Sequence, residues 1–195
     1  MLADMTDDGL ARPFDFDAKY GAGARRGLVL GGGGIFFIAW QVAYLRELES
    51  RGVDLAAADI VIGTSAGSLV SSILTGRKLR RFAGELSLLS KVPKVVDALA
   101  PAGNLAPSQD HALQLFQQAA DNKPETIKAI GYAALAAHAA PAAKMRRSVS
   151  AAVRMTKWPA ASLNIATVDT YTGERLIINR AAGVPVAAAS AASSA

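Results

Sequence analysis

The hydrophobic pattern predicts two strand–turn–helix units in the first half of the chain. In the first unit, the stretch 25–30 leads into four glycines at 31–34 and then into an apolar helical stretch that continues through Leu48. In the second unit, the β-branched run 60–62 leads through a glycine-flanked turn into the apolar stretch 69–74. Short apolar runs bounded by glycine are typical of buried parallel strands, and the longer apolar stretches after them are typical of helices.

A third strand and a hairpin are predicted near the end of the chain. The run 163–169 is strand-like, and a turn at 172–174 leads into a further apolar stretch, 175–178. Asp169 is interpreted as the turn residue that opens this hairpin. Between the two halves, residues 77–157 are rich in Ala, Leu, Lys and Arg and contain five prolines, which indicates several helices.

The composition fits one folded domain. The chain has 195 residues, of which 51% are hydrophobic and 19% charged. We assign residues 25–195 to the domain and residues 1–24 to a flexible segment without the apolar core of a signal peptide. The absence of cysteine favours a reducing compartment, and the longest apolar run, 28–40, is too short to cross a membrane. We therefore expect a cytoplasmic protein.

The positive charge of the chain is concentrated in the helical region. Residues 77–157 contain 13 Lys or Arg against 5 Asp or Glu, a formal charge of +8, whereas the whole chain carries +5. The basic runs 77–81 and 144–147 would suit peripheral docking on an anionic membrane, although a solvated helix face is the commoner meaning of such runs. Few aromatic residues and no recognisable motif accompany this charge, so no nucleic-acid partner is expected.

The turn of the second unit has the spacing of a nucleophile elbow. Gly63-Thr64-Ser65-Ala66-Gly67 is a G-x-S-x-G sequence between a predicted strand and a predicted helix. In such an elbow the serine occupies a strained turn that exposes its Oγ, and a side chain at either glycine would collide with neighbouring backbone. Small residues at such a turn also serve close packing alone, so the motif by itself leaves a purely structural role open.

The glycine run of the first unit offers backbone amides to an anion. Such amides suit either a phosphate or the oxyanion of an acyl-transfer reaction. A dinucleotide fingerprint would need a third glycine at Phe36 or Phe37, and a phosphate loop would need a Gly-Lys pair that neither glycine run supplies. The oxyanion interpretation is therefore the stronger one.

The glycine loop, followed by the serine elbow, resembles the bacterial type of the patatin-like phospholipase family. The resemblance rests mainly on residues 25–76 and more weakly on the strand and turn at 163–174. It implies a three-layer α/β/α fold with a mainly parallel central sheet and a helical insertion. It also implies a lipid acyl hydrolase with a Ser-Asp dyad and no cofactor or metal. The residues implied are the nucleophile Ser65, the oxyanion donors Gly32, Gly33 and Gly34, and the elbow glycines Gly63 and Gly67.

Two departures from the family pattern bear on activity. The family carries its catalytic aspartate in an Asp-Gly turn beyond the small-residue segment, but the chain's one Asp-Gly pair is Asp8-Gly9. This predicts either a C-terminally incomplete enzyme or a family member without its acid, which would leave Ser65 a poor nucleophile. Phe36 and Phe37 stand where the family usually has a basic residue and a glycine. They would either disturb the oxyanion loop or belong to the core of the helix start.

The two histidines, His111 and His138, lie in no motif, and neither is assigned a role. A dyad without histidine is compatible with this, whereas a serine triad would need a histidine late in the chain. The expected partner is a lipid or phospholipid ester, and the alternative function is a catalytically inactive lipid- or membrane-binding module.

Overall fold

The computed structural model describes residues 20–91, 105–139 and 141–195. Most of the predicted flexible segment, up to residue 19, lies outside the described residues. The described strands are β1 (Gly27–Leu30), β2 (Ile60–Thr64), β3 (Leu163–Val168) and β4 (Arg175–Ile178). The described helices are α1 (Gly34–Ser50), α2 (Ala66–Thr75), α3 (Leu79–Leu89), α5 (Pro107–Gln117), α6 (Pro124–Ala136), α7 (Ala142–Val153) and α8 (Val186–Ser193), with short 3-10 turns at Leu55–Ala57 and Arg180–Ala182.

The four strands form one mixed sheet in the order β1-β2-β3-β4. β1 pairs parallel with β2, β2 pairs parallel with β3, and β3 pairs antiparallel with β4. The predicted α/β class and the predicted hairpin are confirmed. Asp169 begins the hairpin turn, where its Oδ1 accepts hydrogen bonds from the backbone amides of Tyr171 at 2.8 Å and Thr172 at 3.0 Å.

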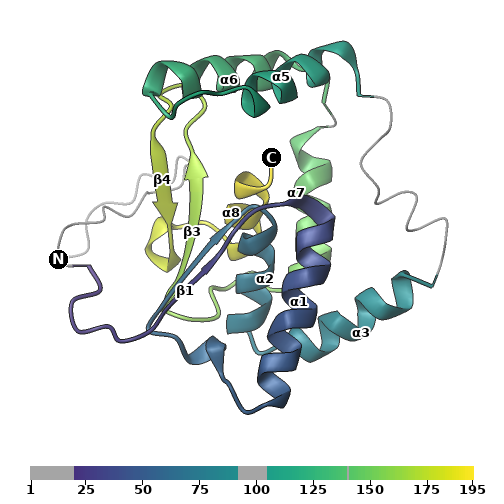
Figure 1. The fold of residues 1–195 in the computed structure, drawn as a ribbon, viewed down its shortest axis with the longest axis vertical. Coiled ribbons are helices and arrows are strands. Elements are labelled where there is room, and N and C mark those ends of the chain that lie inside the picture. Colours follow the sequence, from purple (N-terminus) through teal and green to yellow (C-terminus); the bar gives the residue numbers. More distant parts are fainter. Residues whose placement is uncertain (1–19, 92–104, 140) are drawn as a thin grey trace.

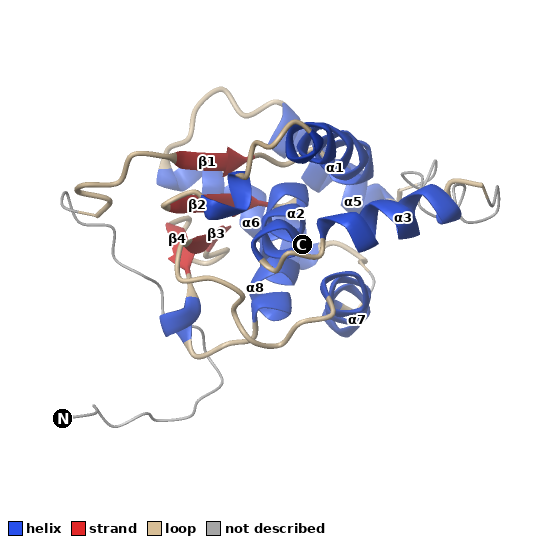
Figure 2. Cartoon of the chain, turned by 90° about the horizontal axis from the view of Figure 1, so that it is seen from below, coloured by secondary structure: helices blue, strands red, loops and turns tan. Residues whose placement is uncertain are grey.

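Helices α2 and α8 pack against the sheet and form its core (Figures 1 and 2). Val61, Leu163 and Ile165 of the sheet are fully buried in one cluster with the α2 residues Val70 and Ile73. Side chains alternate along a strand, so the residues next to these in the sequence lie on the other face of the sheet. On that face Val168 is 49% exposed.

Strand β1 differs from its prediction as a buried strand. It is an edge strand of the described sheet, and Val29 is 72% exposed. The apolar run 28–30 predicts a strand correctly, but a run of three apolar residues does not distinguish a central strand from an edge strand.

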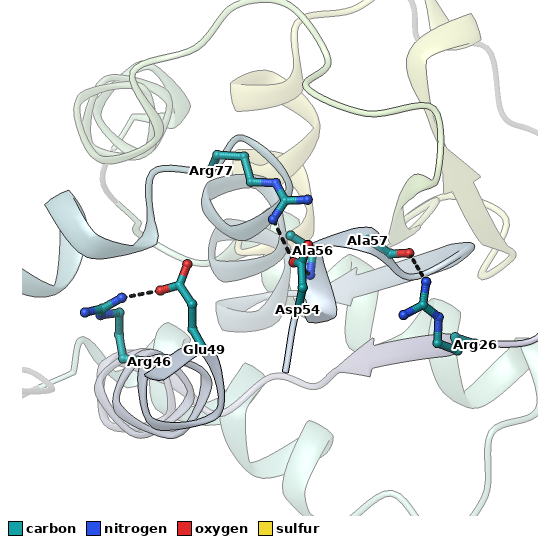
Figure 3. Close-up of polar contacts among 7 residues, drawn as sticks. All are labelled: Arg26, Arg46, Glu49, Asp54, Ala56, Ala57 and Arg77. Carbon is teal, nitrogen blue, oxygen red and sulfur yellow. Dashed lines mark hydrogen bonds and ion pairs between the residues drawn. The ribbon is translucent and has the colours of Figure 1, made fainter. Parts of the chain in front are cut away.

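A polar turn fixes the path from α1 into β2 (Figure 3). Asp54 caps the 3-10 turn through Oδ1, which accepts from the Ala56 amide at 3.1 Å and pairs with Arg77 at 2.7 Å. Arg26, just before β1, donates to the Ala57 carbonyl at 2.8 Å. These contacts join the 3-10 turn to the residues just before β1 and just before α3.

Helix α2 is buried along its whole length, including its hydroxyl residues. Ser68, Ser72 and Thr75 donate to carbonyls three or four residues earlier in the chain, at 2.7 Å each, so burial leaves these donors satisfied. Where α2 contacts α8, Ser72 Oγ lies 3.2 Å from Ser190 Oγ of α8. Small hydroxyl residues therefore let α8 approach α2 closely.

The described part of the basic region is helical, as predicted. Figure 1 shows α5 and α6 lying across the end of the sheet where β3 and β4 are joined. Gly131 of α6 allows this contact, because a Cβ there would lie 2.5 Å from the Thr170 carbonyl oxygen. α3 is tied to the end of α7 by Lys78 Nζ, which donates to the Arg154 carbonyl at 3.0 Å. The residues 92–104 of this region lie outside the described residues.

The end of the predicted flexible segment is folded against the sheet. Asn164, which is fully buried, donates to the Tyr20 hydroxyl at 2.9 Å, and a turn joins the Ala24 amide to the Gly21 carbonyl at 2.8 Å. Within the described ranges, none of the helices combines the length and apolarity needed to cross a bilayer.

Candidate active site

Ser65 occupies a strained turn between β2 and α2. Its backbone has φ 50° and ψ −120°, a conformation that L residues rarely adopt. β2 ends at Thr64 and α2 begins at Ala66, so the serine lies at the positive end of the helix dipole. Its Oγ does not cap the helix, and it makes no hydrogen bond with any residue that the structure describes. The half-buried hydroxyl is therefore available to a substrate.

Both glycines of the elbow are required by close backbone contacts. A Cβ at Gly67 would lie 1.9 Å from the Leu30 carbonyl oxygen, and a Cβ at Gly63 would lie 2.6 Å from the Gly67 carbonyl oxygen. Two non-bonded heavy atoms cannot lie 1.9 Å apart, so any side chain at Gly67 would separate the elbow from the end of β1. The Gly67 amide also donates to the Gly31 carbonyl at 3.1 Å, which fastens the elbow to the glycine loop.

The glycine loop lies directly against the nucleophile candidate. A Cβ at Gly32 would lie 3.2 Å from Ser65 Cβ and 3.7 Å from Ser65 Oγ. Gly33 and Gly34 have φ values of 142° and 64°, which favour glycine, and Gly33 begins α1 as its N-cap. The structure thus brings together all six residues singled out by sequence, namely Gly32, Gly33, Gly34, Gly63, Ser65 and Gly67.

Several backbone amides near Ser65 have no acceptor among the described residues. Among the described residues, the amides of Gly32, Gly33 and Gly34 donate no hydrogen bond. The Ala66 amide, which follows the serine, has no intrahelical acceptor because Ala66 is the first residue of α2. An amide in this position is the usual second donor of an oxyanion hole, and the sequence analysis did not single it out.

Neither Phe36 nor Phe37 is buried at the start of α1. Phe37 packs over Gly33, where a Cβ would lie 2.3 Å from the Phe37 ring, whereas Phe36 is 70% exposed. A role for both rings in the core is therefore wrong. Phe37 also contacts the ring of Trp40, and Trp40 stacks on Tyr44 with a centroid distance of 5.3 Å, so aromatic rings line one side of α1.

Two residues outside the motifs make hydrogen bonds to the elbow and to the glycine loop. Ser193 Oγ accepts from the Ser65 amide at 2.8 Å and donates to the Ala166 carbonyl at 2.6 Å. Gln41, which is buried in α1, donates through Nε2 to the Gly31 carbonyl at 2.8 Å. The sequence signals for these roles are a glutamine among the apolar residues of the first half of α1 and a serine in the alanine-rich α8.

No acid of the described residues pairs with Ser65. Asp169 belongs to the hairpin turn, where the backbone amides of Thr172 and Tyr171 hold the pKa of its carboxyl below the usual value. His138 contributes its backbone amide to Ser108 Oγ at 3.0 Å, a contact between α5 and the end of α6. Within the described ranges, no three His, Cys, Asp or Glu side chains gather in a way that could hold a metal.

The arrangement can position a carbonyl for attack but does not itself supply a base. Attack on a carbonyl needs a nucleophile and donors for the oxyanion, and Ser65 Oγ and the unpaired amides of the glycine loop are groups of these two kinds. Comparisons of the chain with protein-family models, with curated proteins and with solved structures return no match.

Proposed function

We propose that the chain carries the nucleophile and the oxyanion amides of a patatin-like serine acyl hydrolase that acts on lipid or phospholipid esters. The observation that carries the proposal is the free Oγ of Ser65 in a strained turn, with Gly32 packed against it. In this proposal Ser65 Oγ attacks the ester carbonyl, an aspartate absent from this chain accepts the proton, and water releases the acyl group. No cofactor takes part.

The proposal extends to the finer fold and the location. The mostly parallel sheet, covered on one face by α2 and α8, is compatible with two layers of a three-layer α/β/α patatin-like domain. The half-exposed opposite face is where a third layer would lie. The protein would work in the cytoplasm and approach lipid as a peripheral protein.

Active-site labelling tests the function directly. We expect a fluorophosphonate probe to label Ser65 in a version of the protein that supplies the aspartate, and we expect Ser65→Ala in that version to abolish the labelling. Ser87→Ala, which changes an exposed serine on α3, is the matched control and should label like the parent. Labelling that persists in Ser65→Ala, or equal loss in both variants, would overturn the assignment of Ser65.

A second candidate function is a catalytically inactive lipid- or membrane-binding module. It is favoured by the lack of an acid beside Ser65 in the described residues and by the exposed rings of Phe36, Trp40 and Tyr44. An absence of labelling, combined with vesicle binding that is unchanged in Ser65→Ala, would select this function over the hydrolase.

A further inference from the structure

A pocket of about 680 Å³ lies on the opposite end of α8 from the serine site. Its walls are one side of α7, the loop 154–159 and the first turn of α8. Figures 1 and 2 show α7 and α8 side by side. Because Ser193 contacts the Ser65 amide from the last turn of α8, whereas Ala187 lines the pocket from the first, the two sites are separated by roughly 9 Å of helix.

Basic side chains outnumber the carboxylates that pair with them at the pocket. Arg146, Arg154 and Lys157 line it, and no Asp or Glu does. Arg154 pairs with Glu85 at 3.3 Å, but Arg146 and Lys157 form no ion pair with any residue in the described part of the chain. The first turn of α8 adds the positive end of its dipole to the same space. The field in the pocket therefore favours an anion.

Apart from Ser150 and Thr156, the rest of the lining is apolar. Met155, Trp158, Pro159 and Pro185 contribute most of it, together with the two alanines of α8. An apolar floor beneath cationic side chains suits a ligand with both an anionic head and an apolar body. A free inorganic anion would leave that floor uncovered.

The walls of the pocket are fixed to the core by hydrogen bonds. Trp158 Nε1 donates to the Val184 carbonyl at 2.8 Å, and the Val186 amide donates to the Thr156 carbonyl at 3.2 Å. Met155 packs against Gly76 at the end of α2, where a Cβ would lie 2.6 Å from its sulfur. The loop that carries the pocket residues is thus held at three places, so the pocket is preformed.

From these observations we propose that the α7–α8 pocket binds an amphiphilic anion, that is, a phosphate or carboxylate head group attached to an apolar chain. Arg146 and Lys157 hold the head group through charge-assisted hydrogen bonds, and the chain lies on Trp158 and Met155. The proposal does not depend on Ser65, because no residue of the pocket belongs to the serine site.

Calorimetric titration with octyl phosphate below its micelle concentration tests the proposal. Inorganic phosphate and octanol, each carrying one half of the ligand, separate a head-group site from an apolar site. We expect saturable binding of octyl phosphate and about tenfold weaker binding of either half. Octanoate tests the carboxylate head group. Equal affinity for inorganic phosphate and octyl phosphate, or no binding of octyl phosphate and octanoate, would overturn the proposal.

Neighbouring arginines on α7 provide the matched variants. Arg146 lines the pocket and Arg147 does not, although both are exposed and carry the same charge. Arg146→Gln is expected to weaken binding about tenfold, and Arg147→Gln is expected to leave it within about twofold. Equal losses in the two variants would mean attraction to net charge alone. Because both substitutions are on a helix surface, circular dichroism should show both variants folded.

Trp158 offers a second readout at the pocket itself. The chain has two tryptophans, so Trp40→Phe leaves Trp158 as the single indole fluorophore. Octyl phosphate should then change the emission of Trp158 with the same dissociation constant that calorimetry gives. If calorimetry detects binding but the emission of Trp158 does not change, the ligand binds outside the pocket and the proposal is contradicted. Since Ser65→Ala should bind octyl phosphate like the parent, failure of the hydrolase proposal and failure of this one are distinguishable.

Discussion

Ser193 Oγ accepts the backbone N–H of Ser65 at 2.8 Å, although 128 residues separate the two serines in the chain. The same hydroxyl donates to the Ala166 carbonyl at 2.6 Å, so one side chain joins the elbow, β3 and α8. The Ser65 amide could not be satisfied within α2, because Ser65 precedes the first turn of that helix. The last helix of the chain therefore helps to fix the backbone of the nucleophile candidate.

Ser193→Ala should loosen this junction. The substitution leaves the Ser65 amide and the Ala166 carbonyl without their partner, and the expected loss is about 1–3 kcal/mol in the free energy of unfolding. Urea denaturation measures this loss, and fluorophosphonate labelling of Ser65 should slow in parallel. Ser194→Ala is the control, since Ser194 donates only to the Ser190 carbonyl within α8. Equal stability of the two variants would contradict the role given to Ser193.

Two glycine substitutions should have opposite effects on stability. Gly67→Ala places a Cβ 1.9 Å from the Leu30 carbonyl oxygen, so β1 or α2 must move, and we expect a loss of about 3 kcal/mol or more. Gly84→Ala lies in α3 with no atom within 4 Å of the added Cβ, so a gain of about 0.5–1 kcal/mol is expected. Thermal unfolding of the pair measures both effects. A folded Gly67→Ala protein of parental stability would show that the elbow and β1 do not touch.

The local elements could be predicted because their signals are local. Glycines after apolar runs mark the turns before α1 and α2, and Asp169 with Gly173 marks the hairpin between β3 and β4. The grouping of Gly32 with Ser65 follows from the geometry of parallel strands, whose carboxyl ends lie at one edge of the sheet.

Long-range contacts could not be predicted in the same way. Nothing in the run 28–30 shows that β1 lies at the edge of the described sheet, because strand order depends on which chain segments pair. Likewise, Ser193 is one serine among many in small-residue segments, and its bond to the Ser65 amide depends on how α8 packs. The α7–α8 pocket joins residues 146–159 with residues 185–188, and β3 and β4 separate these two segments in the sequence.

Stability should fall in acid because several aspartates are hydrogen-bonded in the folded chain. The backbone amides of Arg25 and Arg26 donate to Asp59 and lower the pKa of its carboxyl, and the Arg77 guanidinium lowers the pKa of Asp54. A carboxyl whose pKa is lower in the folded state stabilises the fold above its unfolded pKa of about 3.9. This stabilisation is lost as the pH falls through the folded pKa.

Asp59→Asn isolates one contribution to this pH dependence. The variant should be less stable than the parent at pH 7, and the difference should shrink as the pH is lowered below about 4, since the parent carboxyl then becomes protonated. Thermal unfolding followed from pH 7 to pH 2.5 measures the difference. A difference that stays constant over this range would mean that Asp59 has the same pKa in the folded and unfolded chains.

Membrane association, if it follows the basic helices and the aromatic side of α1, should depend on both salt and Trp40. Vesicles with anionic lipid should bind the chain, and raising the salt from 0.1 to 1 M, which shortens the Debye length from about 10 to 3 Å, should weaken the binding. Trp40→Ala should lower the vesicle affinity about tenfold, because the half-exposed indole suits the headgroup region. Tyr171→Ala in the β3–β4 turn, which removes an exposed ring outside α1 and outside the basic helices, is the control. Co-sedimentation with the vesicles measures these affinities. Vesicle binding that changes neither with salt nor with Trp40→Ala would contradict the assignment of lipid binding to this surface.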